Sequence, residues 1–288
     1  MKKIILYAAL LLSLTSTAQA KEESLLVAGD SWAMFMCIYQ SFQDVLWGHG
    51  YLAGVTGCDD ATRFGGRADE WTTYSQNTAM VSWLTKDPRI TTVYLSIGGN
   101  DFFANWTTSL TPAQEQAAFQ KIAASIQSII DEILKLRPDV RVLISGYDYG
   151  NFKDYSKIIS AYTNIYKQMG SPTTAQSQQA VLRLSNVVAT LADQKHVFYI
   201  QHYGLSQWYY GNKDYNLKPF MTTPPSRISP PSDPAQYGGN PDIEAPEDSL
   251  LDLFGIHDAY HPDLVEFYNI ALHSFKFYFK DWFKDSKI

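Results

Sequence analysis

The chain has 288 residues with 23 basic and 29 acidic side chains, a formal net charge of −6, and 45% hydrophobic residues. This length and apolar content predict one large α/β domain or two small ones with a full hydrophobic core. The negative balance argues against binding to nucleic acid or to anionic membranes, because both attract basic surfaces.

The first twenty residues have the pattern of a secretory signal peptide. Lys2-Lys3 precedes an apolar stretch from Ile4 to Leu14, and Ala18-Gln19-Ala20 forms a small-x-small cleavage site. The apolar stretch is shorter than the roughly 20 residues of a membrane-spanning helix, and no second such run follows. We expect a mature chain of residues 21–288, periplasmic or secreted, without stable membrane insertion; a retained membrane anchor is the alternative. Cleavage would take the net charge from −6 to −8.

The first expected strand is the apolar run Leu25 to Ala28, which ends at Gly29-Asp30-Ser31. A serine in the turn above a sheet is a candidate nucleophile, provided that the chain also supplies a base and donors for an oxyanion. A helix is expected from Ala33 to Trp47, up to the breaker Gly48-His49-Gly50. A glycine-rich, turn-prone stretch follows from Gly54 to Arg67.

Further along, β-type and helix-type patterns alternate. Thr91 to Ile97 is a β-branched, apolar run that predicts a buried strand ending at Gly98-Gly99. A helix begins at the capping box of Thr111 and ends at Arg137-Pro138. The remaining expected elements are a strand at 140–145, a helix marked by Val181, Leu184, Val188 and Leu191, a strand at 196–200, and a last helix carrying Leu264, Phe267, Ile270, Ala271 and Phe275.

This alternation predicts right-handed crossovers and a parallel sheet that is covered on both faces. Ligands of such sheets bind beyond the carboxyl ends of the strands. Because Gly29-Asp30-Ser31 and Gly98-Gly99-Asn100-Asp101 both follow expected strands, we expect them on one rim. Residues 204–256, rich in Tyr, Trp, Pro and Gly, interrupt the alternation. We interpret them as a long irregular insertion within a single domain spanning residues 21–288.

The chain has two cysteines, Cys37 and Cys58. In an exported protein an even pair favours a disulfide over a metal site, and no histidine pair stands beside them at ligand spacing. A bridge would connect the helix after Ser31 to the loop near Cys58. Two buried free thiols are the alternative.

A candidate base lies just before the last helix, in Asp258-Ala259-Tyr260-His261. A carboxylate three positions before a histidine can orient the imidazole when the segment forms a turn; a solvated loop is the alternative. Asn100 is a neutral amide at the end of an expected buried strand, which suits an oxyanion donor. A turn-forming asparagine is its alternative.

Other candidates fit less well. His257 adjoins Asp258 but lacks the three-residue spacing of His261, and His49, His196 and His202 are expected to be structural. The segment Gly204-Leu205-Ser206-Gln207-Trp208 lacks the final glycine of a nucleophile elbow, so we reject Ser206 as the nucleophile.

The order of the motifs, from Gly-Asp-Ser through Gly-x-Asn-Asp to Asp-x-x-His, resembles the SGNH (GDSL-type) superfamily of esterases and lipases. The resemblance covers the chain from Leu25 to the last helix and implies a flavodoxin-like three-layer α/β/α sandwich. It implies that Ser31 is the nucleophile, His261 the general base and Asp258 the residue that orients it.

The same resemblance implies three oxyanion donors: the Ser31 N–H, the Asn100 side chain and a loop glycine. Matching Ala68 and Trp71 to the family pattern selects Gly65, with Gly66 as the second choice. Trp32 stands where the GDSL name has leucine, a position that does not carry the chemistry.

The expected function is therefore an exported serine esterase that hydrolyses carbohydrate O-acyl or lipid esters through an acyl-enzyme. Its partner is a small-molecule, lipid or glycan ester, it needs no metal or other cofactor, and its oligomeric state is not predicted. One alternative is an acyltransferase that passes the acyl group to a sugar or lipid alcohol. The other is a non-catalytic carbohydrate-binding protein. The candidate pocket and sugar-stacking residues are Tyr147, Tyr149, Trp208, Tyr209, Tyr210 and Tyr215.

Overall fold

The computed structural model describes residues 21–152, 160–211, 240–252 and 257–288. The expected signal peptide, Tyr215 and much of the expected insertion lie outside the described residues. Within the described ranges, no helix is both long and apolar enough to cross a membrane.

A parallel sheet forms the centre of the molecule, with the strand order β2-β1-β3-β4-β5. Its strands are β1 (Ser24–Gly29), β2 (Gly54–Thr56), β3 (Ile90–Ser96), β4 (Arg141–Ser145) and β5 (Val197–Ile200). This is the order of flavodoxin-like doubly wound sheets. The strands β1, β3 and β4 are almost entirely buried, which explains their largely apolar sequences, whereas the edge strand β2 is only half-buried. The expected fold class is confirmed, although β2 lies in a stretch where only turns were predicted.

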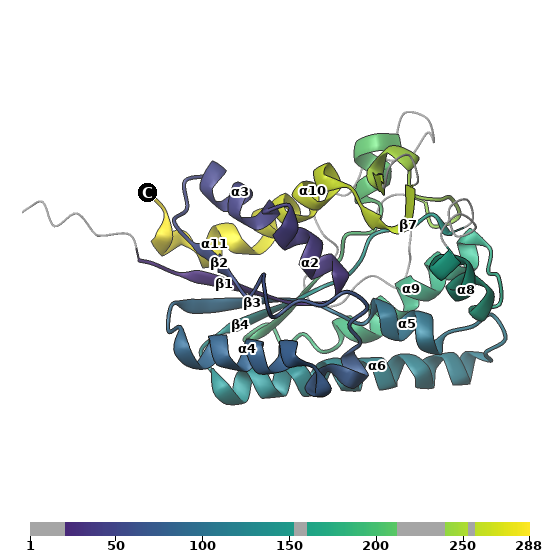
Figure 1. Cartoon of the computed structure of the whole chain (residues 1–288), viewed down its shortest axis with the longest axis horizontal. Helices are drawn as coiled ribbons and strands as arrows, with labels where there is room; N and C mark the ends of the chain where they lie inside the picture. The colour runs from purple at the N-terminus through teal and green to yellow at the C-terminus, as the bar shows by residue number, and fades with distance from the viewer. Residues whose placement is uncertain (1–20, 153–159, 212–239, 253–256) are drawn as a thin grey trace, which may run out of the picture.

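Helices cover both faces of the sheet (Figure 1). One layer contains α2 (Ser31–Ile38), α3 (Ser41–Gly48), α10 (Leu264–Ser274) and α11 (Lys280–Trp282), with a π-helical turn at Phe275–Phe279 and a 3-10 turn at Lys284–Ser286. The other contains the 3-10 helix η1 (Ala68–Thr73), α4 (Ser75–Lys86), α5 (Gly99–Asn105), α6 (Pro112–Leu136) and α9 (Thr174–Ala189). The short helix α8 (Ser160–Gln168) lies near β7 at the carboxyl end of the sheet.

Two capping boxes set the starts of the longest helices. Thr111 and Gln114 form the predicted box at the start of α6, whose isoleucines line one buried face. Thr173 and Gln176 form a second box. That box starts α9 well before Val181, the first apolar residue by which we had recognised this helix.

The single helix predicted from Ala33 to Trp47 is wrong, because the chain breaks into α2 and α3 at Gln40, which has a φ of 53°. Continuing the 3.6-residue spacing from the buried Met36 would place Gln40 and Gln43 against the core. The break resets the helical register, so that α3 buries Phe42 instead.

The described part of the expected irregular insertion contains regular structure as well. A π-helical turn spans Gln207–Gly211 and a 3-10 turn spans Glu247–Ser249. They are followed by β6 (Leu250–Asp252), which pairs antiparallel with β7 (His257–Pro262). The segment β6 is a strand because its backbone pairs with β7, which is a tertiary contact. No local sequence pattern predicts a strand there.

Candidate active site

The turn after β1 holds Ser31 at the first position of α2. The Asp30 N–H donates to the Ser96 carbonyl of β3 at 2.8 Å, and the Asp30 carboxylate caps α2 by accepting the Trp32 N–H at 3.0 Å. Gly29 has a φ of 137°, and a Cβ there would lie 1.9 Å from the Ser96 oxygen. Only glycine fits this close approach, so the geometry of the turn explains why glycine begins the Gly-Asp-Ser sequence.

The two motifs at strand ends flank the topological switch point of the sheet. From β1 the chain continues to β2 on one side, and β3 and β4 lie on the other. Gly29-Asp30-Ser31 leaves β1, and Gly98-Gly99-Asn100-Asp101 leaves β3 directly beside it. In open α/β sheets this crevice is where ligands bind.

Tyr147, just beyond β4, joins the two motifs. Its hydroxyl donates to Asp30 Oδ2 at 2.6 Å and accepts the Gly99 N–H at 2.9 Å. Burial raises the pKa of Asp30 to about 7, although the hydrogen bonds from Tyr147 and the Trp32 N–H act in the opposite direction. Asp30 therefore braces the turn through buried hydrogen bonds.

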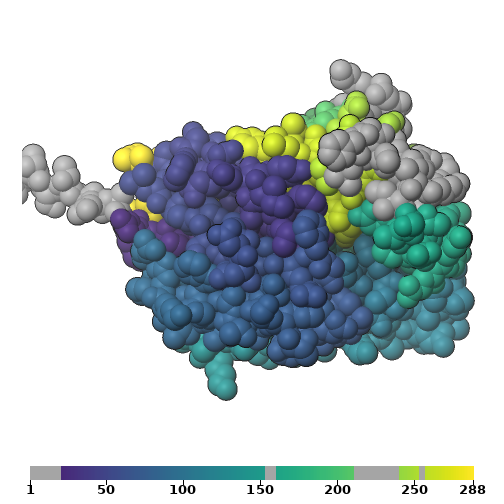
Figure 2. All heavy atoms as spheres, viewed as in Figure 1, coloured from purple at the N-terminus to yellow at the C-terminus, as the bar shows by residue number. Residues whose placement is uncertain are grey.

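His261 comes from the far end of the chain to meet Ser31. Figure 1 and Figure 2 show the N-terminal helix α2 lying against α10, which directly follows the strand that carries His261. The His261 Nε2 lies 2.7 Å from Ser31 Oγ, and both residues are buried. The Phe35 ring, one turn after Ser31 on α2, packs against the imidazole with centroids 5.0 Å apart.

The Asp258 carboxylate is hydrogen-bonded to the imidazole of His261. Its Oδ2 lies 2.9 Å from His261 Nδ1, and its Oδ1 accepts the backbone N–H groups of Tyr260 and His261, both at 2.8 Å. Burial disfavours the ionised form, yet the hydrogen bond and charge of His261 and the two N–H groups hold the pKa of Asp258 below its ordinary value. The tautomer with hydrogen on Nδ1 then leaves Nε2 free to accept the Ser31 proton.

Asn100 and the loop around Gly65 lie together. The Asn100 Nδ2 donates to the Gly66 carbonyl at 3.0 Å, which uses one of its two N–H bonds. Asp101 accepts the N–H groups of Ala68 and Asp69 at 2.8 and 3.1 Å. These bonds fasten the start of α5 to the glycine loop and to the residues that follow it, so that the two candidate oxyanion donors are held beside each other.

The backbone bonds distinguish the two candidate glycines. The Gly66 N–H donates to the Arg63 carbonyl at 3.2 Å, whereas the Gly65 N–H has no acceptor among the residues that the structure describes. Gly65 is exposed and has a φ of 67°, the left-handed conformation that favours glycine. The geometry therefore leaves the Gly65 N–H available for a ligand.

Tyr162 of α8 is a site residue that sequence reasoning missed. Its hydroxyl donates to Asp258 Oδ2 at 2.7 Å and lies 3.1 Å from His261 Nδ1. It is one of 19 tyrosines and has no motif around it, so no signal in the sequence could have selected it.

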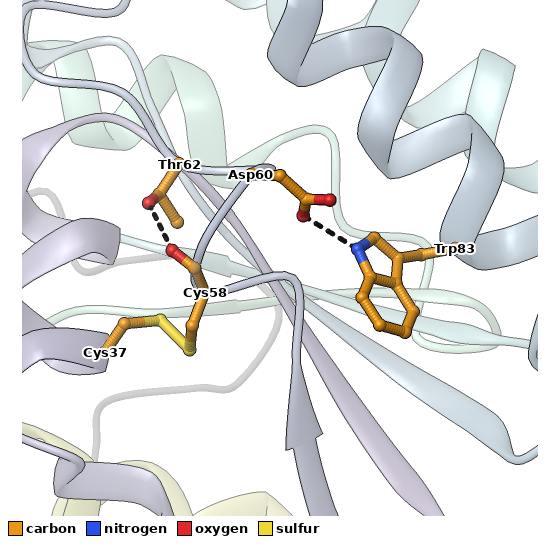
Figure 3. Close-up of a disulfide and its surroundings, with 5 residues drawn as sticks. All are labelled: Cys37, Cys58, Asp60, Thr62 and Trp83. Atoms are coloured by element: carbon orange, nitrogen blue, oxygen red, sulfur yellow. Dashed lines mark hydrogen bonds between the residues drawn. A yellow bond between two sulfur atoms is a disulfide. The ribbon is translucent and has the colours of Figure 1, made fainter.

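The predicted disulfide between Cys37 and Cys58 is present and connects the last turn of α2 to the loop after β2 (Figure 3). The same loop is held by the Thr62 hydroxyl, which donates to the Cys58 carbonyl at 3.1 Å, and by the Trp83 indole, which donates to Asp60 at 2.7 Å. This bracing precedes Gly65 in the chain by only a few residues.

The other candidate residues lie away from Ser31 or have packing roles. His257 pairs with Glu247 at 3.3 Å, and His202 lies against His273 in the core. Ser206 is buried, and its N–H donates to Asp148 at 2.7 Å.

Among the candidate pocket residues, Tyr149 is buried, Trp208 packs on the core, and the Tyr210 hydroxyl donates to Asp263 at 3.0 Å. No cluster of potential metal ligands occurs in the described ranges.

No protein-family model matches the sequence, and no curated protein matches it. Among solved structures, the Clostridium thermocellum family 3 carbohydrate esterase is 14% identical with a TM-score of 0.46, covering 92% of this chain and 98% of its own. The Talaromyces cellulolyticus family 3 carbohydrate esterase is 12% identical with a TM-score of 0.43, and the match covers 91% of this chain and 99% of its own. The M. smegmatis aryl esterase is 12% identical with a TM-score of 0.48, and the match covers 87% of this chain and 95% of its own. Because these TM-scores lie below 0.5, we base the function of this chain on its own residues.

Proposed function

We propose that the protein is a serine esterase of the SGNH type that hydrolyses acyl esters with Ser31 as nucleophile, His261 as general base and Asp258 as the residue that orients it. The observation that carries this proposal is the hydrogen-bonded chain from Ser31 Oγ through the imidazole to Asp258, at 2.7 and 2.9 Å. Its location at the switch point supports the proposal further, because substrates of this sheet type bind there.

In the proposed reaction, Ser31 Oγ attacks the carbonyl carbon of the ester while His261 Nε2 takes the serine proton. The tetrahedral intermediate then collapses, the bond to the alcohol oxygen breaks, and the alcohol leaves with that proton. Water, deprotonated by His261, attacks the acyl-enzyme and releases the carboxylic acid, which restores the Ser31 hydroxyl.

The negative oxygen of each intermediate would be stabilised by three donors: the Ser31 N–H, the Gly65 N–H and the second Nδ2–H bond of Asn100. The unused Gly65 N–H and the attachment of Asn100 to the same loop support this assignment. Donors that are held in place before the reaction lower the barrier most.

We further propose that the esterase is exported after cleavage before Lys21. The disulfide Cys37–Cys58 supports export, because such bonds persist in oxidising compartments. N-terminal sequencing of the periplasmic or secreted protein should then begin at Lys21.

The proposal is tested by comparing Ser31→Ala with Ser206→Ala, since Ser206 also follows a glycine by two positions. Hydrolysis of p-nitrophenyl acetate should fall about 10³-fold or more in Ser31→Ala. It should remain near the wild-type rate in Ser206→Ala. A Ser31→Ala protein that turns over the ester at the wild-type rate would overturn the assignment.

A further inference from the structure

The Asp258 carboxylate receives more donors than a triad requires. Its Oδ1 accepts two backbone N–H groups, and its Oδ2 accepts both the His261 ring and the Tyr162 hydroxyl, at 2.9 and 2.7 Å. The backbone bonds and the imidazole already define the orientation of the carboxylate. The Tyr162 bond is therefore not needed to aim Asp258 at the imidazole.

Tyr162 acts on the one oxygen that His261 also uses. A hydroxyl that donates to a carboxylate draws negative charge from the accepting oxygen. Two donors on Oδ2 thus compete for the same charge, and the attraction between Asp258 and a protonated imidazole is weakened.

Resting on the proposed function, we propose that Tyr162 is a positioning residue that tunes the triad: its hydrogen bond to Asp258 Oδ2 lets His261 lose its proton, and so act as a base, at lower pH. The catalytic groups are unchanged in this proposal. The Tyr162 hydroxyl contacts Asp258 Oδ2 and His261 Nδ1, not the reacting atoms Ser31 Oγ and His261 Nε2, and in this proposal it acts through Asp258.

The other groups that face His261 leave room for this effect. Phe35 from α2 offers only an apolar ring. Burial raises the pKa values of Tyr162 and Tyr260, so both keep their protons through acid and neutral pH. Asp30 interacts electrostatically with His261 and has a pKa of about 7, so its ionisation must be separated from the effect of Tyr162.

The lone pairs of the Tyr162 oxygen have the opposite effect, because they lie 3.1 Å from His261 Nδ1 and would favour the protonated ring. A neutral hydroxyl attracts a cation less strongly than a carboxylate does. We therefore expect the action on Asp258 to prevail, which fixes the direction of the shift.

The experiment compares Tyr162→Phe with Tyr74→Phe, which removes a tyrosine–carboxylate bond of the same kind at Glu70, outside the triad. The first readout is the pH dependence of kcat/KM for p-nitrophenyl acetate. In Tyr162→Phe the midpoint of the acid limb should move up by about half a pH unit or more. In Tyr74→Phe it should stay at the wild-type midpoint.

The same comparison in an Asp30→Asn background removes the titration of Asp30, and the shift should persist there. The second readout is the titration of the His261 ring by NMR, which needs no turnover. It should move in the same direction in Tyr162→Phe.

Each failure points to a different claim. If Ser31→Ala retains turnover, the proposed function fails, and the NMR titration alone decides the role of Tyr162. If turnover requires Ser31 but both readouts of Tyr162→Phe coincide with wild type, or move to lower pH, the inference is wrong while the esterase assignment stands.

Discussion

The two halves of the candidate site are built in different ways. On the nucleophile side, the β1–β3 ladder and the bond from the Asp30 N–H to Ser96 anchor the turn to the sheet, and the Asn100 side chain attaches the glycine loop beside it. The base side, comprising Asp258, His261 and Tyr162, depends on side-chain bonds around the short strand β7. A sheet is costly to disturb, whereas a side-chain network can be altered one atom at a time.

Because of this difference, we expect the reaction rate and the free energy of unfolding to respond differently to substitutions on the two sides of the site. Substitutions on the base side should alter the rate with modest loss of folding free energy. Substitutions of glycine or aspartate in the turn that holds Ser31 should mainly lower the free energy of unfolding.

Asp258→Asn should lower kcat by about 10⁴-fold. The amide would present N–H to His261 Nδ1, so the ring would place its own hydrogen on Nε2 and could no longer accept the Ser31 proton. Steady-state kinetics with p-nitrophenyl acetate measure this loss. A fall of less than tenfold would mean that Asp258 does not set the tautomer.

Gly29→Ala should destabilise the fold by about 2–5 kcal/mol, from overpacking against Ser96 O together with left-handed strain. Gly65→Ala is the matched control, because its φ is also positive but a Cβ there meets nothing within 4 Å. It should cost only about 1–2 kcal/mol. Urea unfolding of both variants measures the difference, and equal costs would contradict the close approach at β3.

Asn100→Ala should lower kcat by about 10²–10³-fold through loss of one oxyanion donor. Asn105→Ala, on the same helix, removes an amide that donates to the Asp101 carbonyl, and it serves as the control. We expect Asn100→Ala and Asn105→Ala to have similar unfolding midpoints and very different kcat values. Similar kcat values would remove Asn100 from the oxyanion site.

Asp30→Asn should flatten the pH dependence of stability. Because the folded pKa of Asp30 is raised to about 7 from 3.8, its contribution is full below about pH 4 and is lost as pH rises through 7. Wild type should lose about 1.4 kcal/mol per pH unit relative to the variant in this window. Urea unfolding at pH 5, 6 and 7 checks this, and parallel curves would contradict it.

Asp258, on the base side, has the opposite sign, which sharpens the comparison. Its pKa is lowered, so its contribution is present above the unfolded pKa near 4 and is lost as pH falls further. The two carboxylates should therefore limit stability at opposite ends of the pH range.

The placement of Gly29-Asp30-Ser31 and Gly98-Gly99-Asn100-Asp101 at the ends of neighbouring strands could be predicted because each motif directly follows its own strand. An apolar run that ends in Gly-Asp-Ser predicts that a strand ends there. Parallel strands have their carboxyl ends on the same edge of the sheet. Asp258 and His261 could be proposed because a carboxylate three positions before a histidine can reach its ring; the structure places both on strand β7 and not in the expected turn.

The missed features depend on tertiary contacts. Tyr162 reaches Asp258 across 96 positions of sequence. The break at Gln40 depends on which face of α2 meets the core, and β6 is a strand only through its pairing with β7. Local secondary-structure propensity does not predict such tertiary contacts.

The central claim is that His261 activates Ser31, and fluorophosphonate labelling tests it most directly. Peptide mass spectrometry should locate the label at Ser31 in the wild-type protein and find none in Ser31→Ala. In His261→Ala the labelling rate should fall about a hundredfold or more, because the serine loses its general base. Labelling at another serine, or an undiminished rate in His261→Ala, would contradict the account.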